Sequence, residues 1–312
     1  MFSFLRSSVS LFSLFVLASL MPKDAIVLSE AIPESSLRQG HFWTPDEANL
    51  EMKGFARTWN DRASWEQRTR VIREGILHGL HWDRMPKIKG GFRPIIHSRK
   101  EMDGYVVENI AIRSFAGFYV TGNLYSPANP KAKNPAILNP HGHATDKRVK
   151  EDVQKRCAAF ARMGAIAFAY DMVGYAESTQ VNHKMPIAAL LQAWNSTRVL
   201  EYLLSRPDVD PEMIGMTGGS GGGTQTFVLA AIDDRIAVSA PVVQVSAHFF
   251  GGCVCESGMP IHQSESYGTN NVEFAAMAAP RPLMIVSDGA DWTRNSPRIE
   301  YPYIQSVYAL FD

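Results

Sequence analysis

The sequence predicts an α/β domain built on a mostly parallel, doubly wound sheet with an antiparallel edge at its N-terminal side. From residue 135 onward, short continuous apolar segments alternate with helical segments, which is typical of parallel strands buried on both faces. Before residue 127, two segments alternate apolar and polar residues, which favours an antiparallel meander. No linker interrupts the alternation, so residues 32–312 are expected to form one domain.

The elements follow from local patterns. A helical extension is expected over about residues 32–100, where Thr44 caps one helix and Trp65, Ile72 and Ile76 share one face of a second helix at 64–77. The meander is expected at 105–112 and 117–125. The parallel strands are expected at 136–139, 165–170, 213–217, 237–243 and 282–287, with helices at 151–163, 187–205 and 224–231.

The first 31 residues are expected to be a secretory signal peptide. One basic side chain precedes a 13-residue apolar run at 9–21, which is too short to span a bilayer comfortably. Pro22 and Lys23 end the run, and small residues up to Ala31 suit a signal peptidase, with the cut between 25 and 31. A buried helix and a retained anchor are the alternatives. We therefore expect a secreted or periplasmic protein.

Composition excludes few classes of function. The 312 residues include 31 basic and 31 acidic side chains, and 46% of them are hydrophobic, as in an ordinary globular protein with a large core. Because the net charge is zero, neither nucleic acid nor an acidic membrane surface is expected as a partner. The sequence shows no repeat and does not indicate an oligomeric state.

Ser220 is the candidate nucleophile. The segment 218–222 reads Gly-Gly-Ser-Gly-Gly and fits the G-x-S-x-G nucleophile elbow, with an apolar strand before it and a helix after it. A nucleophilic serine must stand clear of the sheet on a strained turn, so residues two positions away cannot carry a Cβ. The helix N-terminus then favours a developing oxyanion. A glycine-rich loop with an incidental serine is the alternative.

Chemistry in an open parallel sheet gathers at the carboxyl ends of the strands. The strand at 136–139 ends at one such loop, which contains His141 and His143. The amide of His143 is expected to pair with that of Gly221 as an oxyanion hole. It is an equally good interpretation that both histidines are ordinary turn residues whose side chains have no catalytic role. The loop at 171–178 is expected to support the elbow structurally.

Three carboxylates are candidates for the acid that orients a catalytic histidine. Asp291 is preferred because the acid usually lies a few residues past a strand end, Asp288 is the runner-up, and Glu256 follows the preceding strand. One of the two aspartates is expected to cap a turn instead.

Three aromatic residues offer surfaces on which a sugar ring could stack, and core packing explains each equally well. They are Trp292, Tyr175 and Trp194.

The three cysteines are too few for a disulfide framework. Cys253 and Cys255 are too close along the chain for an ordinary bridge. Without Cys or His partners at zinc-finger spacing, they are expected to make a poor zinc site. Cys157 is expected to be a core residue, although a bridge from it to Cys253 or Cys255 stays open.

Three segments, 139–143, 209–225 and 279–292, carry a family resemblance. They resemble the secreted bacterial α/β-hydrolases known as acetyl xylan esterases, within the dienelactone hydrolase and prolyl oligopeptidase-like superfamily. The resemblance covers residues 40–312. It implies the α/β-hydrolase fold, a Ser-Asp-His triad in that chain order, and an ester substrate such as an acetylated polysaccharide. It also implies that neither a metal nor another cofactor takes part.

The sequence departs from that family at the triad histidine, which should follow the acid after one further strand. None of the nine histidines follows Asp291. We therefore expect the last strand, the closing helix and the histidine to be missing, as in a fragment of an intact esterase. The alternatives are a non-catalytic saccharide-binding relative and a rewired site in which His262 or His143 reaches Ser220. A prolyl oligopeptidase-like peptidase ranks lower, because only about a hundred residues without repeats precede the first parallel strand.

Overall fold

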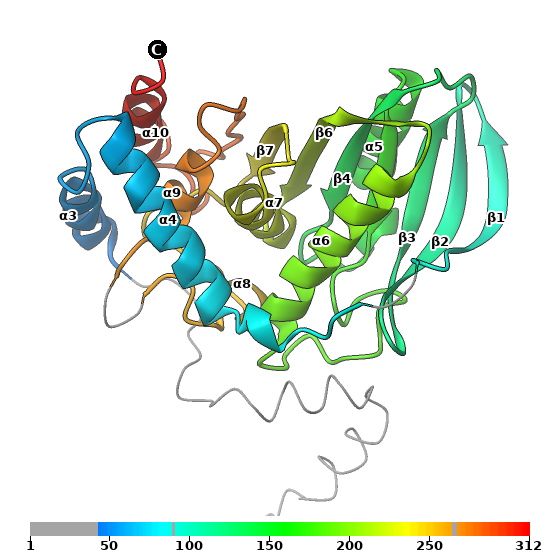
Figure 1. Cartoon of the computed structure of the whole chain (residues 1–312), viewed down its shortest axis with the longest axis horizontal. Helices are drawn as coiled ribbons and strands as arrows, with labels where there is room; N and C mark the ends of the chain where they lie inside the picture. Colours follow the sequence, from blue (N-terminus) through cyan, green and yellow to red (C-terminus); the bar gives the residue numbers. More distant parts are fainter. Residues whose placement is uncertain (1–42, 89–90, 264–266) are drawn as a thin grey trace, which may run out of the picture.

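The computed structural model describes residues 43–88, 91–263 and 267–312, which form a seven-stranded sheet with helices on both faces (Figure 1). The order of the strands is β1-β2-β3-β5-β4-β6-β7. The expected signal peptide lies outside the described residues. The strands are β1 (Ile95–Met102), β2 (Tyr105–Phe115), β3 (Phe118–Pro127), β4 (Asn134–Pro140), β5 (Ile166–Tyr170), β6 (Val209–Gly219) and β7 (Val238–Val242).

The sheet has an antiparallel half and a parallel half. β1, β2, β3 and β5 pair antiparallel in that order, whereas β5, β4, β6 and β7 pair parallel. This arrangement confirms the expected fold class. β1 is a strand that the sequence analysis assigned to the helical extension, and all eight of its residues are exposed. Its missing hydrophobic alternation explains why it was overlooked.

The helices cover both faces of the sheet. They are α3 (Pro45–Phe55), α4 (Arg62–Gly79), α5 (Glu151–Arg162), α6 (Ala188–Ser205), α7 (Gly221–Ile232), α8 (Val254–Ser257), α9 (Asn271–Ala276) and α10 (Glu300–Tyr308), with short 3-10 turns η2 (Trp82–Arg84) and η3 (Lys147–Val149). Among the described residues, no helix combines the length and apolar character needed to cross a membrane.

Side-chain alternation along the strands decides which helix each face meets. In β5, Ala167 and Ala169 pack with Cys157 of α5, whereas Ile166 and Phe168 pack with residues of α6 and α7. α5 therefore lies behind the sheet and α6 in front of it in the view of Figure 1. Because each face of the central strands meets a helix layer, their sequences are continuously apolar.

The N-terminal helices pack against the C-terminal part of the chain. Thr44 and Glu47 form a capping box at the start of α3, as the sequence predicted for Thr44. The indole Nε1 of Trp59, between α3 and α4, donates to the hydroxyl of Tyr303 in α10 at 3.1 Å. The same hydroxyl donates to the buried Glu273 of α9, which is also paired with Arg68 of α4. Helices at opposite ends of the sequence thus share one core (Figure 1).

The segment expected as the last parallel strand, 282–287, does not form a full strand. It joins the sheet only through two isolated parallel bridges, Leu283 with Ser239 and Val286 with Val242. α10 follows this segment and buries Ile304 and Val307 against the core.

A buried ion-pair network supports the loop that follows β5. The guanidinium of Arg148 donates to Asp171, to Asn123 and to Glu177. Asp171 is fully buried and also accepts from the hydroxyl of Thr121 at 2.7 Å. These contacts agree with the structural role expected for the loop at 171–178.

We predict that Arg148→Met lowers the free energy of unfolding by about 3–5 kcal/mol, because Asp171 is left buried without its cation. Chemical denaturation at neutral pH measures this change. Lys155→Met is the matched control, since it breaks only the exposed pair of Lys155 with Glu151 and should change stability little. Equal losses in the two variants would contradict the network's role.

Candidate active site

Ser220 occupies a strained turn between β6 and α7. Its φ of 52° and ψ of −122° lie in a region that non-glycine residues rarely adopt. The turn is held by the amide of Ser220, which donates to the carbonyl of Val242 in β7 at 2.9 Å, and by the amide of Thr224, which donates back to the Ser220 carbonyl. The strand, strained serine and helix predicted from the sequence are therefore present.

The glycines around Ser220 are required by contact with the end of β4. A Cβ built on Gly218 would lie 2.4 Å from the carbonyl oxygen of Pro140, and a Cβ on Gly222 would lie equally close to the same oxygen. Gly219, by contrast, has open space at its Cβ position. The prediction that positions two residues from the serine cannot carry a Cβ is confirmed, and the obstructing group is a backbone carbonyl.

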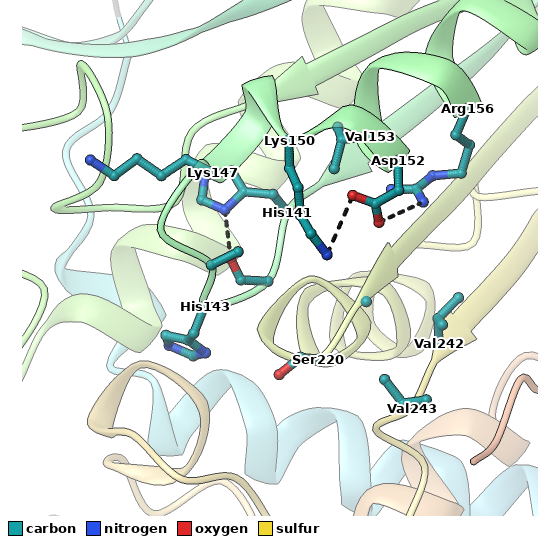
Figure 2. Close-up of a pocket in the computed structure, with 13 residues that line it drawn as sticks. His141, His143, Lys147, Lys150, Asp152, Val153, Arg156, Ser220, Val242 and Val243 are labelled. Carbon is teal, nitrogen blue, oxygen red and sulfur yellow. Dashed lines mark hydrogen bonds and ion pairs between the residues drawn. The ribbon is translucent and has the colours of Figure 1, made fainter.

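A cavity of about 280 Å³ opens in front of Ser220 at the carboxyl ends of β4, β6 and β7. Figure 2 shows Ser220 at its floor, with the ring of His143 to one side and Val242 and Val243 to the other. Charged side chains form the opposite wall. They are Lys147, Lys150, Asp152 and Arg156, which come from η3 and α5 and the residues between them.

The two backbone amides predicted to form an oxyanion hole belong to Gly221 and His143. Gly221 is the first residue of α7, where N–H groups lack partners within the helix. The His143 amide donates to no backbone carbonyl in the part of the chain that the structure describes. The loop that carries His143 touches the elbow closely, since a Cβ on Gly142 would lie 2.6 Å from the carbonyl of Gly219 and 3.1 Å from the Cβ of Ser220.

His141 is a buried structural residue. Its Nδ1 donates to the carbonyl of Gly142 at 2.8 Å, and its Nε2 accepts from the amide of Met172 at 3.1 Å. Burial lowers the pKa of this imidazole, and the two hydrogen bonds select the Nδ1–H tautomer of the neutral ring. His141 thereby ties the loop after β4 to the loop after β5. The sequence left open whether the His141 side chain has a catalytic role or is only part of a turn, and these contacts support the second interpretation.

The side chain of His143 belongs to a cluster that the sequence analysis missed. His143, His183, Cys253 and Cys255 each offer a ligand atom, and these four atoms lie within 4.8 Å of one another. The Nε2 atom of His143 is 3.0 Å from that of His183 and 3.2 Å from the sulfur of Cys255. Both histidines lie far from Cys253 and Cys255 in the sequence, so the search for partners at zinc-finger spacing could not find them.

The chain is similar in sequence or in fold to several esterases. The solved structure of methylesterase BT1017 superposes with a TM-score of 0.82 and 40% sequence identity over 86% of this chain and 61% of its own. A 4-O-methyl-glucuronoyl methylesterase from Neurospora crassa is 29% identical over 137 residues, 34% of each protein. A putative acetyl xylan esterase from Bacteroides fragilis shares the fold, with a TM-score of 0.60 and 14% identity over 86% of this chain and 84% of its own. No family model matches the sequence.

The chain has the α/β-hydrolase fold. The sheet order, the elbow and the 40% identity agree on this point, and the resemblance stated from the sequence is confirmed in that form. The chain spans less than two thirds of the length of methylesterase BT1017 and of the Neurospora crassa methylesterase.

The three candidate acids differ in their surroundings. Asp291 accepts from both the amide and the hydroxyl of Thr293 at 2.6 Å, and Asp288 accepts from the amide of Ala290 at 2.7 Å, so both aspartates cap turns. Glu256 of α8 is buried, accepts from the amide of Gly252 at 2.9 Å, and has its pKa raised by burial. The choice among the three stays a prediction.

The three aromatic candidates separate by position. Trp292 donates from Nε1 to the carbonyl of Val243, a pocket-lining residue, and stacks against Phe249. Tyr175 contacts the ring of His143 with centroids 6.0 Å apart, so it also lies near the site. Trp194 packs against Trp82 and the main core and does not line the pocket, which favours core packing for this residue.

Among the described residues, no histidine hydrogen-bonds to the Ser220 hydroxyl. His262 is stacked between Phe250 and Phe274 and hydrogen-bonds to Asn271 at 2.7 Å. His143 turns its Nε2 toward His183 and Cys255 instead. These contacts give no support to a rewired base at either histidine.

We predict that Gly218→Ala and Gly222→Ala each destabilise the fold by about 1–3 kcal/mol or more, since the new methyl group meets the Pro140 carbonyl. Thermal unfolding followed by circular dichroism measures the loss. Gly219→Ala, one residue away on the same turn, should unfold near the temperature of the unsubstituted protein. A loss in this control equal to that of its neighbours would show that the carbonyl contact is not the cause.

Proposed function

We propose that this hydrolase is a serine esterase that cleaves ester bonds of polysaccharides, with Ser220 as its nucleophile. The proposal is carried by the strained Ser220 turn, which faces the pocket beside the amides of Gly221 and His143. A pure binding protein has no evident use for a strained serine at a helix N-terminus. The two methylesterases among its relatives support an ester substrate, and a signal peptide would bring the protein to polysaccharides outside the cell.

The chemistry follows from this arrangement. The Ser220 oxygen attacks the ester carbonyl. The negatively charged oxygen of the tetrahedral intermediate then accepts hydrogen bonds from the backbone N–H groups of Gly221 and His143. The alcohol leaves, and water then releases the acid from the acyl-enzyme. A base must take the proton of Ser220 and pass it to the leaving alcohol, and we assign Asp291 to orient that base.

The charges of the pocket favour a particular ester. Lys147, Lys150 and Arg156 outnumber Asp152 among the residues that line the pocket. Asp152 pairs with Lys150 at 3.4 Å and with Arg156 at 4.0 Å, while Lys147 lies over the ring of Tyr175. A net positive wall attracts carboxylates, so we propose a uronic acid methyl ester within a polysaccharide that also carries free carboxylates.

An acetyl ester, the substrate expected from the sequence, is the second candidate. An acetylated neutral saccharide would give the basic wall no anion to bind. The two esters are separated by comparing a methyl-esterified uronic acid oligosaccharide with an acetylated xylo-oligosaccharide at equal ester concentration. Release of methanol and release of acetate are the respective measurements.

We predict that Ser220→Ala lowers the rate of ester hydrolysis by at least about 10⁴-fold, because the nucleophile is lost. Saccharide binding, measured by calorimetry, should stay within about twofold of the unsubstituted protein. If the unsubstituted protein binds saccharide and hydrolyses neither ester, a non-catalytic saccharide-binding protein replaces this proposal. Turnover that survives Ser220→Ala would place the chemistry elsewhere.

We predict that Lys147→Gln raises KM for the methyl-esterified uronic acid substrate by about tenfold with little change in kcat, since a charge-assisted contact to a neighbouring carboxylate is lost. The effect should shrink at high salt. KM for the acetylated neutral substrate should not change. Lys155→Gln, an exposed charge change on α5 outside the pocket, is the control. Equal KM changes for both substrates would remove the argument for an anionic polysaccharide.

A further inference from the structure

Two histidine side chains and two cysteine side chains from three separate loops come together beside the elbow. His143 follows β4, His183 lies between β5 and α6, and Cys253 and Cys255 lie at the start of α8. Their ligand atoms are all within 4.8 Å of one another. His183, Cys253 and Cys255 are buried, and neither cysteine is in a disulfide.

The orientation of His183 distinguishes this cluster from a chance contact. Its Nδ1 donates to the carbonyl of Val173 at 2.6 Å, so in the neutral ring the lone pair is on Nε2. That Nε2 lies 3.0 Å from the Nε2 of His143, inside the cluster. Metal-binding histidines commonly show this arrangement, in which the outer ring nitrogen donates to a backbone carbonyl and the inner one faces the metal.

The separations suit one small tetrahedral ion. With metal–nitrogen bonds of about 2.0 Å and metal–sulfur bonds of about 2.3 Å, tetrahedral ligands lie about 3.3–3.8 Å apart. The distances of 3.0 Å from His143 Nε2 to His183 Nε2 and 3.2 Å to the Cys255 sulfur are close to this range. Two nitrogens and two sulfurs form the Cys₂His₂ set that selects zinc over magnesium or calcium.

We infer that His143, His183, Cys253 and Cys255 bind one zinc ion in a closed, structural site. Four protein ligands fill the tetrahedron and leave no open position for water, which sets this site apart from catalytic zinc centres. Lys184 lies beside the cluster, with its ammonium 3.6 Å from the Cys253 sulfur. The ion would join the three loops at the carboxyl edge of the sheet.

The site has a direct connection to the elbow. A Cβ on Gly221 would lie 2.9 Å from Cε1 of the His143 ring, so the ring that binds the ion packs on the residue after Ser220. Fixing this ring also fixes the backbone that carries the His143 amide. In this inference the side chain of His143 binds zinc. Its backbone amide donates to the oxyanion, and this second role rests on the proposed function.

The test begins with metal content. The protein, expressed without an affinity tag from its native gene and purified without chelator, is expected to carry one zinc ion per chain by inductively coupled plasma mass spectrometry. Exchange for cobalt should give a thiolate-to-cobalt charge-transfer band and the strong visible bands of a tetrahedral site. A folded protein that binds no zinc even after incubation with zinc alone, or that gives an octahedral cobalt spectrum, would overturn the inference.

Variants locate the ion. Cys253→Ser with Cys255→Ser should lose the zinc and the charge-transfer band, and His183→Ala should lower zinc affinity by at least about tenfold. Cys157→Ala is the matched control, because this buried thiol packs with α5 and β5 away from the cluster and should retain the metal. Zinc loss in the control alone, or retention in the double variant, would contradict the assignment.

Chelation separates this inference from the proposed function. Removing zinc from the unsubstituted protein should lower its melting temperature by at least about 5 °C, and added zinc should restore it. If the esterase proposal is right, kcat should fall with zinc loss more than KM rises. Failure to hydrolyse any ester would leave the metal content and the melting shift unaffected, so each idea can fail without the other. An unchanged melting temperature after complete zinc removal would overturn the structural role.

Discussion

The contact between the carbonyl of Pro140 and the glycines at 218 and 222 is the constraint on which the site depends. It brings the end of β4 so close to the turn after β6 that neither glycine can carry a side chain. This closeness directs Ser220 into the pocket and brings the loop of His143 alongside Gly221. Rigid backbone packing thereby positions the proposed nucleophile and the two amides proposed as oxyanion donors.

The loops that leave the sheet at this edge are held by polar contacts as well as by apolar packing. His141 joins the loops after β4 and β5, and Arg148 anchors Asp171 at the base of the second loop. The cluster of His143, His183, Cys253 and Cys255 adds the loop after β7. Each contact is local, yet together they fix the geometry around Ser220. Buried polar groups of this kind stabilise only when all members are satisfied, which a shared metal ion would achieve for the cluster.

The parallel half of the fold could be predicted because its central strands are buried on both faces and therefore form continuous apolar runs between helices. The strand at 166–170 and the helices at 151–162 and 188–205 appear within a residue of their expected bounds. β1 was missed because all of its residues are exposed and no face needs apolar side chains. The segment 282–287 has the composition of a strand but makes only two bridges, because strand formation depends on a partner's alignment as well as on composition.

The sequence by itself determined the α/β fold, the strained serine turn and the glycines around it, since these follow from residues adjacent in the chain. Only the tertiary structure decided which loops meet at the carboxyl edge. His143 and His183 are separated by 40 residues, and Cys255 lies a further 72 along the chain, so no spacing rule connects them. The basic wall of Lys147, Lys150 and Arg156 was equally hidden, because a helix places charges around a pocket only once its packing on the sheet is known. Local geometry is encoded by neighbours in sequence, whereas a site assembled from several loops is encoded by the packing of the whole sheet.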